Sequence, residues 1–290
     1  MTGLSIPIHV ETQGRDPRSD VPTFLLVHGY GASSFSWRTW LPSLAERGHV
    51  VVVDLKGFGA APKPDDGAYA PADQAELLCR LIRQRGLQRI TLAGHSLGGG
   101  ICLLSALRLL EAHPGTLQRL VVVSGAAYAQ RLPPFVWFAH HRRLGTGLMR
   151  VLGARWVVRW VLRGIVFDPS RVTRAQVEGY AEPLANRAAR RALVDTALQI
   201  LPTDLDAVTA RYPNLRIPTL LLWGRQDPVV PLGVGQKLAS DLPDAELVVL
   251  DRCGHLPAEE LPGESLAALM YFLDRTEPHL SVQGEPGAKG

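Results

Sequence analysis

Short, wholly apolar runs alternate along the chain with longer segments in which apolar residues recur every three or four positions. The short runs are typical of strands buried on both faces, and the longer period is typical of amphipathic helices. A weaker alternation at residues 4–10 predicts an edge strand. The patterns predict buried strands at residues 23–27, 50–53, 89–93, 120–124, 218–223 and 246–250, and helices at 35–47, 71–85, 97–113 and 263–274.

Strands that alternate with helices in this way form a parallel sheet through right-handed crossovers. We therefore predict an α/β fold with a doubly wound, mostly parallel central sheet. The alternation stops after residue 125 and resumes near residue 216, and the stretch between them has a helical pattern. This divides the chain into a core of residues 1–126 and 208–276 and a helical insert of residues 127–207. Residues 277–290 are rich in Gly and Pro, which predicts a mobile tail.

One helix of the predicted insert has an unusual pattern. Arg155, Arg159 and Arg163 recur at every fourth position, so they form one stripe, with Trp156 and Trp160 beside it. Ordinary packing of the insert accounts for such a helix. A wall for an acyl group, or a lipid-facing surface with arginine at its edge, are the alternatives.

Charge is distributed unevenly over the 290 residues, whose formal net charge is +4. Residues 131–191 contain twelve arginines and only three acidic residues, so a basic insert lies on an acidic core. Such a surface is typical of solvated helix faces, and it also favours anionic substrates or a membrane surface. We expect no nucleic-acid partner, and weak association of the insert with anionic lipid remains open. The sequence indicates no oligomeric state.

The hydrophobic fraction of 46% excludes a disordered chain. The first twenty residues contain no apolar run of the signal-peptide type, and no uninterrupted apolar stretch is long enough to span a membrane. The three cysteines, Cys79, Cys102 and Cys253, have no paired spacing, which argues against a disulfide framework and a zinc site. His140 and His141 have no third ligand at metal spacing. We expect a cytoplasmic protein without a metal or cofactor.

The most informative stretch is Gly94-His95-Ser96-Leu97-Gly98, which joins a predicted strand to a predicted helix. The glycines two residues before and two after Ser96 allow strand and helix to approach closely around a tight turn. Ser96 then has a strained backbone and an exposed hydroxyl. The N–H of Leu97 begins the helix, where unpaired donors favour a developing anion.

A serine hydroxyl needs a nearby base, and the base needs an acid that orients it. Asp227 and His255 each follow a predicted strand, as Ser96 does. Because the carboxyl ends of parallel strands meet at one edge of the sheet, all three side chains can converge there. Asp251 is the rival acid, but it lies only four residues before His255 and is badly placed to orient the ring.

These motifs strongly resemble those of the α/β-hydrolase family. The resemblance covers the serine turn, the His28-Gly29-Tyr30-Gly31 turn, the chain order Ser–Asp–His, and Gly254-His255-x-Pro257 followed by Glu260. It extends from residue 23 to residue 274 and is weakest in the insert. One departure is Ala61, where the family often has Ser.

The resemblance implies that Ser96 is the nucleophile, His255 the base and Asp227 the acid. The backbone N–H groups of Tyr30 and Leu97 would form the oxyanion hole. The insert would be a helical cap over the active site. In this family the residue matching His28 is structural.

Four residues are candidates for the substrate pocket: His95 and Leu256, which adjoin the proposed triad, and Trp156 and Trp160 of the insert. Ordinary packing is the alternative for each. Asp54, at the end of a predicted strand, is expected to cap its turn.

Ser96 stands where epoxide hydrolases and haloalkane dehalogenases have Asp, which favours acyl chemistry. The function that we expect is hydrolysis of a small-molecule carboxylic ester with an apolar acyl group or a small aromatic group. The first alternative is carbon–carbon hydrolysis of vinylogous diketones, although such enzymes usually have Trp, and not Leu256, after the catalytic His. The second is a non-catalytic ligand receptor on the same fold.

Overall fold

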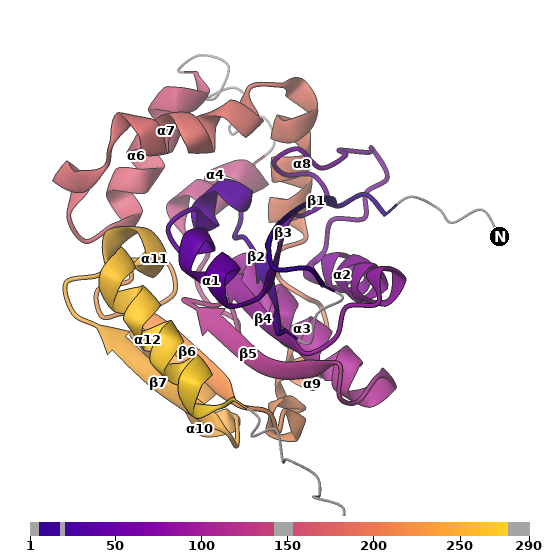
Figure 1. Cartoon of the computed structure of the whole chain (residues 1–290). Coiled ribbons are helices and arrows are strands. Elements are labelled where there is room, and N and C mark those ends of the chain that lie inside the picture. Colours follow the sequence, from indigo (N-terminus) through magenta and orange to yellow (C-terminus); the bar gives the residue numbers. More distant parts are fainter. Residues whose placement is uncertain (1–5, 18–20, 142–152, 278–290) are drawn as a thin grey trace, which may run out of the picture.

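A seven-stranded sheet forms the centre of the computed structural model, which describes residues 6–17, 21–141 and 153–277. The strand order is β1-β3-β2-β4-β5-β6-β7, and only β1 runs antiparallel to its neighbour. The doubly wound α/β class is therefore confirmed (Figure 1). The strands are β1 (His9–Gly14), β2 (Thr23–Val27), β3 (His49–Asp54), β4 (Ile90–His95), β5 (Leu117–Val123), β6 (Thr219–Gly224) and β7 (Ala245–Leu250).

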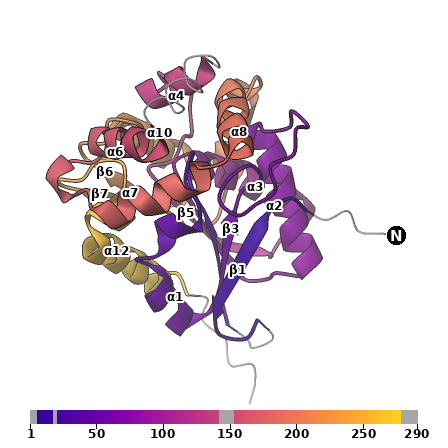
Figure 2. The same ribbon diagram turned by 90° about the horizontal axis from the view of Figure 1, so that it is seen from above.

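Helices cover both faces of the sheet, so β2 to β6 are buried at nearly every position. Alternate side chains of these strands pack into two separate cores. One core joins the sheet to α2 (Pro71–Arg85), α3 (Leu97–Ala112) and α10 (Leu232–Asp241). The other joins it to α1 (Leu41–Arg47) and α12 (Pro262–Arg275). Figure 2 shows α2 and α3 on one side of the sheet and α1 and α12 on the other.

Two predicted elements differ from the structure. The helix expected at 35–47 is split into the 3-10 helix η1 (Ser34–Trp37) and α1, which has Pro42 in its first turn. Proline has no N–H to donate and a fixed φ, so it fits the beginning of an α-helix and not its interior. The edge strand is β1, which begins at His9; residues 6–8 are not part of it, and residues 4 and 5 of the predicted strand lie outside the described residues.

The chain between β5 and β6 is helical in its described part, and α4, α6, α7 and α8 gather at one end of the sheet (Figure 1). Residues 142–152 of the predicted insert and 278–290 of the predicted tail lie outside the described residues. None of the helices that the structure describes has the length and apolarity needed to cross a bilayer. The elements between β5 and β6 are α4 (Pro134–His140), α6 (Ala154–Ile165), η2 (Pro169–Arg171), α7 (Arg174–Ala181), η3 (Glu182–Leu184), α8 (Arg187–Leu198), α9 (Leu205–Thr209) and η4 (Tyr212–Asn214); α11 (Pro257–Glu260) lies between β7 and α12.

Candidate active site

Ser96 occupies the sharp turn between β4 and α3, with φ 54° and ψ −119°. A non-glycine residue with positive φ is strained, and such strain persists only where the surrounding structure imposes it. Here the imposing contacts involve Gly94 and Gly98. A Cβ on Gly98 would lie 2.4 Å from the carbonyl oxygen of His28, and one on Gly94 would lie 2.3 Å from that of Gly98. Strand and helix can approach this closely only with glycine at both positions.

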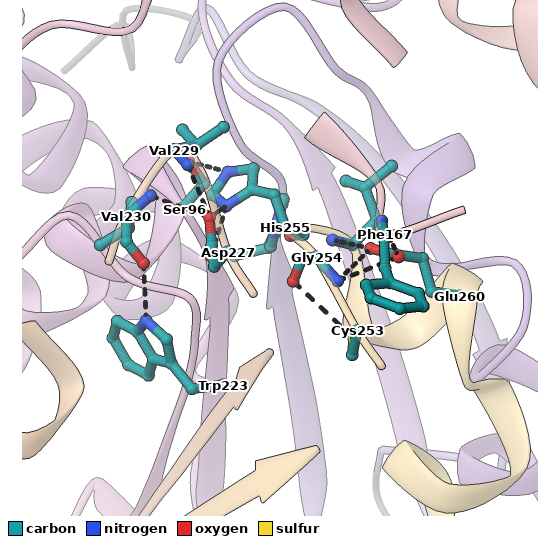
Figure 3. Close-up of polar contacts among 12 residues, drawn as sticks. Ser96, Phe167, Trp223, Asp227, Val229, Val230, Cys253, Gly254, His255 and Glu260 are labelled. Carbon is teal, nitrogen blue, oxygen red and sulfur yellow. Dashed lines mark hydrogen bonds and ion pairs between the residues drawn. The ribbon is translucent and has the colours of Figure 1, made fainter. Parts of the chain in front are cut away.

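His255 joins Ser96 to Asp227 through a chain of hydrogen bonds (Figure 3). Its Nε2 lies 3.0 Å from the Ser96 Oγ, and its Nδ1 lies 2.8 Å from the Asp227 Oδ2 and 3.0 Å from Oδ1. Both His255 and Asp227 are buried, with side chains 4% and 0% exposed. The three residues follow β4, β6 and β7, so the structure brings the predicted trio together at one edge of the sheet.

Asp227 is held as a carboxylate. Burial alone would raise its pKa, but His255 and the N–H groups of Val229 and Val230 outweigh it and leave the pKa below the usual value. The two N–H groups donate to Oδ1 at 2.8 and 2.9 Å. An ionised Asp227 accepts a hydrogen bond from the Nδ1–H of His255, which leaves the lone pair of Nε2 facing the Ser96 hydroxyl. This arrangement can remove the serine proton.

Asp251, the rival acid, is absent from this chain of hydrogen bonds. Its side chain is 71% exposed and forms an ion pair with Arg225. Asp251 lies in the turn after β7, and its carboxylate points to solvent. The loop after β6 instead directs Asp227 inward, to the Nδ1 of His255.

The two expected oxyanion donors lie beside Ser96, and both residues line the same cavity. Leu97 is the first residue of α3, so its N–H has no partner within the helix. Tyr30 lies in the turn after β2, and a Cβ on the preceding Gly29 would be 3.1 Å from the Ser96 Cβ. The Tyr30 hydroxyl donates to the Leu193 carbonyl oxygen at 2.9 Å, which ties this turn to α8.

An apolar cavity opens at Ser96 and His255. Its walls combine core loops with α4, α6, α8 and α9. Three lining tyrosines direct their hydroxyls away into other bonds: Tyr128 to Asp241, Tyr180 to Glu259 and Tyr212 to the Ala127 carbonyl. The cavity can therefore accept an apolar group. Its aliphatic lining includes Leu104, Leu132, Val136, Val157, Val158, Val161, Leu162, Ile165, Leu184, Leu193, Ile200, Leu205 and Val208.

Of the four pocket candidates, His95 and Leu256 line this cavity. Trp156 and Trp160 do not, and that prediction is wrong: they are 54% and 47% exposed on the outer face of α6. The turn of the helix places Val158 and Leu162 inward in their stead.

His95 also supports His255. Burial and the neighbouring His255 lower the pKa of His95 to about 3, so its ring is neutral. Its Nε2 lies 2.8 Å from the His255 carbonyl oxygen, and the two ring centroids are 4.8 Å apart. A neutral ring with hydrogen on Nε2 donates to that carbonyl and helps fix the His255 loop.

His28 and Asp54 have structural contacts, as expected. The Nε2 of His28 accepts from the Leu55 N–H at 3.0 Å. Asp54 accepts from the Ser34 N–H at 2.6 Å and the Ala60 N–H at 2.7 Å, and it thereby fixes the turn after β3. Across the described parts of the chain, no three His, Cys, Asp or Glu side chains gather as a metal site would require.

Sequence reasoning assigned no task to Glu260, although it noted the residue. Its carboxylate accepts from the N–H groups on both sides of His255, those of Gly254 and Leu256, at 3.0 Å. It also accepts from the N–H of Phe167, just beyond α6, at 2.7 Å. Figure 3 shows the carboxylate between the two segments. The one clue in the sequence was that Glu260 follows Gly254-His255-x-Pro257 in the stretch that resembles the family.

Comparison with known proteins agrees with this geometry. A model described as "Alpha/beta hydrolase family" matches residues 24–269. The uncharacterized hydrolase YugF of Bacillus subtilis is 28% identical over 88% of this chain and 88% of its own. The structure of a membrane phospholipase A, described as a bacterial virulence factor, is 27% identical with a TM-score of 0.71, over 93% of this chain and 83% of that one. The 2-hydroxy-6-oxo-6-phenylhexa-2,4-dienoate hydrolase of Rhodococcus sp. strain RHA1 is 26% identical with a TM-score of 0.76, over 92% and 94%.

Proposed function

Since the chain belongs to the alpha/beta hydrolase family, we propose that it cleaves carboxylic esters through an acyl-enzyme on Ser96. The observation that carries this proposal is the hydrogen-bonded chain Ser96–His255–Asp227, whose Ser96 and His255 line an apolar cavity. The hydrogen-bonded chain provides a nucleophile for a carbonyl carbon, and the cavity provides space for an apolar acyl or small aromatic group. In this proposal the helices between β5 and β6 act as a cap.

In the acylation step, His255 Nε2 takes the Ser96 proton while Oγ attacks the ester carbonyl carbon. The negative charge that develops on the carbonyl oxygen is held by the N–H groups of Tyr30 and Leu97. Each such donor is worth about 3 kcal/mol of barrier by analogy with other hydrolases. His255 then gives its proton to the leaving alcohol oxygen as the ester C–O bond breaks.

Water completes the cycle. His255 removes a proton from water as the water oxygen attacks the acyl carbon. It then passes this proton to the Ser96 Oγ as the carboxylic acid product leaves. Asp227 stays ionised and stabilises the imidazolium in both steps. The reaction consumes an ester and a water molecule and releases an acid and an alcohol.

The apolar lining favours the acyl side of a lipid-like ester over a polar metabolite. Similarity to a membrane phospholipase A supports the same class. Carbon–carbon hydrolysis is the second candidate, and similarity to the Rhodococcus dienoate hydrolase supports it. Leu256 stands against it, since enzymes of that kind usually have Trp after the histidine.

The test is hydrolysis of p-nitrophenyl esters from acetate to palmitate by the wild type and by Ser96→Ala. Ser240→Ala is the matched control, because Ser240 is exposed on α10. Its hydroxyl donates to the Lys237 carbonyl oxygen and to the Asp241 carboxylate, both of the same helix. We expect turnover with a chain-length optimum that Ser96→Ala abolishes and Ser240→Ala preserves. A fluorophosphonate probe should label the wild type on Ser96.

If folded protein turns over no ester, the proposal is refuted. Loss of the absorbance of a 2-hydroxy-6-oxo-6-phenylhexa-2,4-dienoate sample would then identify carbon–carbon hydrolysis. Binding of ligands without turnover of either class would identify the receptor alternative.

A further inference from the structure

The outer face of α6 combines arginine and tryptophan and has no acid. On a helix of 3.6 residues per turn, residues 155, 156, 159, 160, 163 and 164 form one half of the surface, and all six are exposed. Three are Arg and two are Trp, and α6 contains no Asp or Glu at all. The opposite half, with Val158, Leu162 and Ile165, is buried.

Packing against the residues that the structure describes does not explain these side chains. Large aromatic rings are normally buried, yet Trp156 is 54% and Trp160 47% exposed. Neither Arg159 nor Arg163 has a hydrogen bond or an ion pair with any residue that the structure describes. Arg155 faces Glu178 of α7, whose pKa is held down chiefly by its bond to Arg174 and further by Arg155. The face therefore presents unused positive charge beside apolar rings.

We propose that this face of α6, defined by Arg155, Trp156, Arg159, Trp160 and Arg163, docks onto the surface of an anionic phospholipid bilayer. Tryptophan prefers the boundary between headgroup and acyl chain, since its ring is apolar and its N–H is polar. Arginine forms paired hydrogen bonds with phosphate oxygens. Two successive turns of α6 each supply an arginine and a tryptophan side by side, and a helix with such a face lies flat on a bilayer surface.

Docking would also place the cavity close to the lipid. The buried half of α6 supplies Val158, Leu162 and Ile165 to the cavity wall. The thickness of one helix, about 10 Å, therefore separates the docking face from the cavity. α6 lies at the periphery of the molecule in both views (Figures 1 and 2), so a flat surface can approach it. Binding of this face to lipid does not depend on which reaction Ser96 performs.

The test is co-sedimentation of the full chain with vesicles of phosphatidylcholine alone or mixed equally with phosphatidylglycerol, at low and high salt. We expect binding to the anionic vesicles only, weakened at high salt because charge attraction is screened. A basic residue near an anionic surface contributes about fivefold to binding. Arg159→Gln with Arg163→Gln should therefore weaken binding about 25-fold, and Trp156→Ser with Trp160→Ser should weaken it at both salt concentrations.

Matched controls distinguish the effect of this face of α6 from the effect of removing any exposed arginine or aromatic residue. Arg85→Gln with Arg216→Gln removes the same charge from two exposed arginines that precede β4 and β6, at the other edge of the sheet from the site. Tyr271→Ser removes an aromatic ring that is 64% exposed on α12. Both controls should bind as the wild type does. All variants replace exposed side chains, and circular dichroism checks that they fold.

Equal binding to neutral and anionic vesicles, or equal losses in the arginine variants and their control, would overturn the proposal. A dimer in sedimentation velocity that the Trp156 and Trp160 changes dissociate would overturn it too, since the face would then contact a second copy of the chain.

Discussion

Replacing Asp227 by Asn removes one charge without changing the shape of the side chain, and the structure determines which way the new amide must face. The Asp227 Oδ1 accepts from the N–H groups of Val229 and Val230 at 2.8 and 2.9 Å. An amide nitrogen cannot accept from these donors, so the amide oxygen must stay there. The amide NH₂ group then points at the Nδ1 of His255, where the carboxylate oxygen Oδ2 was 2.8 Å away.

This reversal changes the tautomer of His255. Facing a donor, Nδ1 must become an acceptor, so the ring hydrogen moves to Nε2. Nε2 lies 3.0 Å from the Ser96 Oγ and would then donate to it, and it can no longer take the serine proton. The same replacement in a serine-protease triad lowers kcat about 10⁴-fold. That corresponds to a barrier higher by about 5 kcal/mol, and we expect a loss of this size here.

Asp251→Asn is the matched control, because it makes the same chemical change in the rival acid. Asp251 is exposed and pairs with Arg225, and exposed ion pairs contribute at most about 1 kcal/mol. The measurement is kcat for p-nitrophenyl butyrate, with labelling of Ser96 by a fluorophosphonate as a second readout. We expect Asp251→Asn to stay within about twofold of the wild type. The reasoning is refuted if folded Asp227→Asn keeps more than a tenth of wild-type kcat, or if Asp251→Asn loses as much.

Three further predictions follow from the same contacts. Gly98→Ala should lower Tm by about 5 °C, since overpacking against backbone costs about 3 kcal/mol, whereas Gly263→Ala in α12, whose Cβ would meet no atom within 4 Å, should not lower it. Glu260→Gln turns an acceptor into a donor beside three N–H groups, so we expect kcat about tenfold lower with KM little changed; an unaltered kcat would contradict this. The folded-state pKa of Asp227 lies below the usual 3.8, so its charge stabilises the fold above that pH and the benefit is lost as pH falls below it. The Tm difference between wild type and Asp227→Asn should therefore narrow from pH 7 to pH 3, and a constant difference would contradict the assignment.

Much of the sheet and the three central residues of the site could be predicted from the sequence. Wholly apolar runs identify strands buried on both faces, because few other structures tolerate them. Ser96, Asp227 and His255 each follow such a run, and parallel strands bring their carboxyl ends to one edge. Glycine on either side of Ser96 identified the tight turn, since a Cβ there would strike backbone.

Other features were decided only by tertiary contacts. The arginine stripe of α6 marks one side of the helix as exposed, but Trp156 and Trp160 lie between that stripe and the apolar side, so the sequence does not say whether the tryptophans face inward. Packing against the core selected Val158 and Leu162 and left Trp156 and Trp160 outside. Glu260 contacts Phe167 of a segment 93 residues away, and the Tyr30 hydroxyl reaches the Leu193 carbonyl across 163 residues. Local sequence encodes strand, turn and helix because those depend on neighbouring residues. The pairing of distant segments depends on how the whole chain fills space, and only the folded structure determines it.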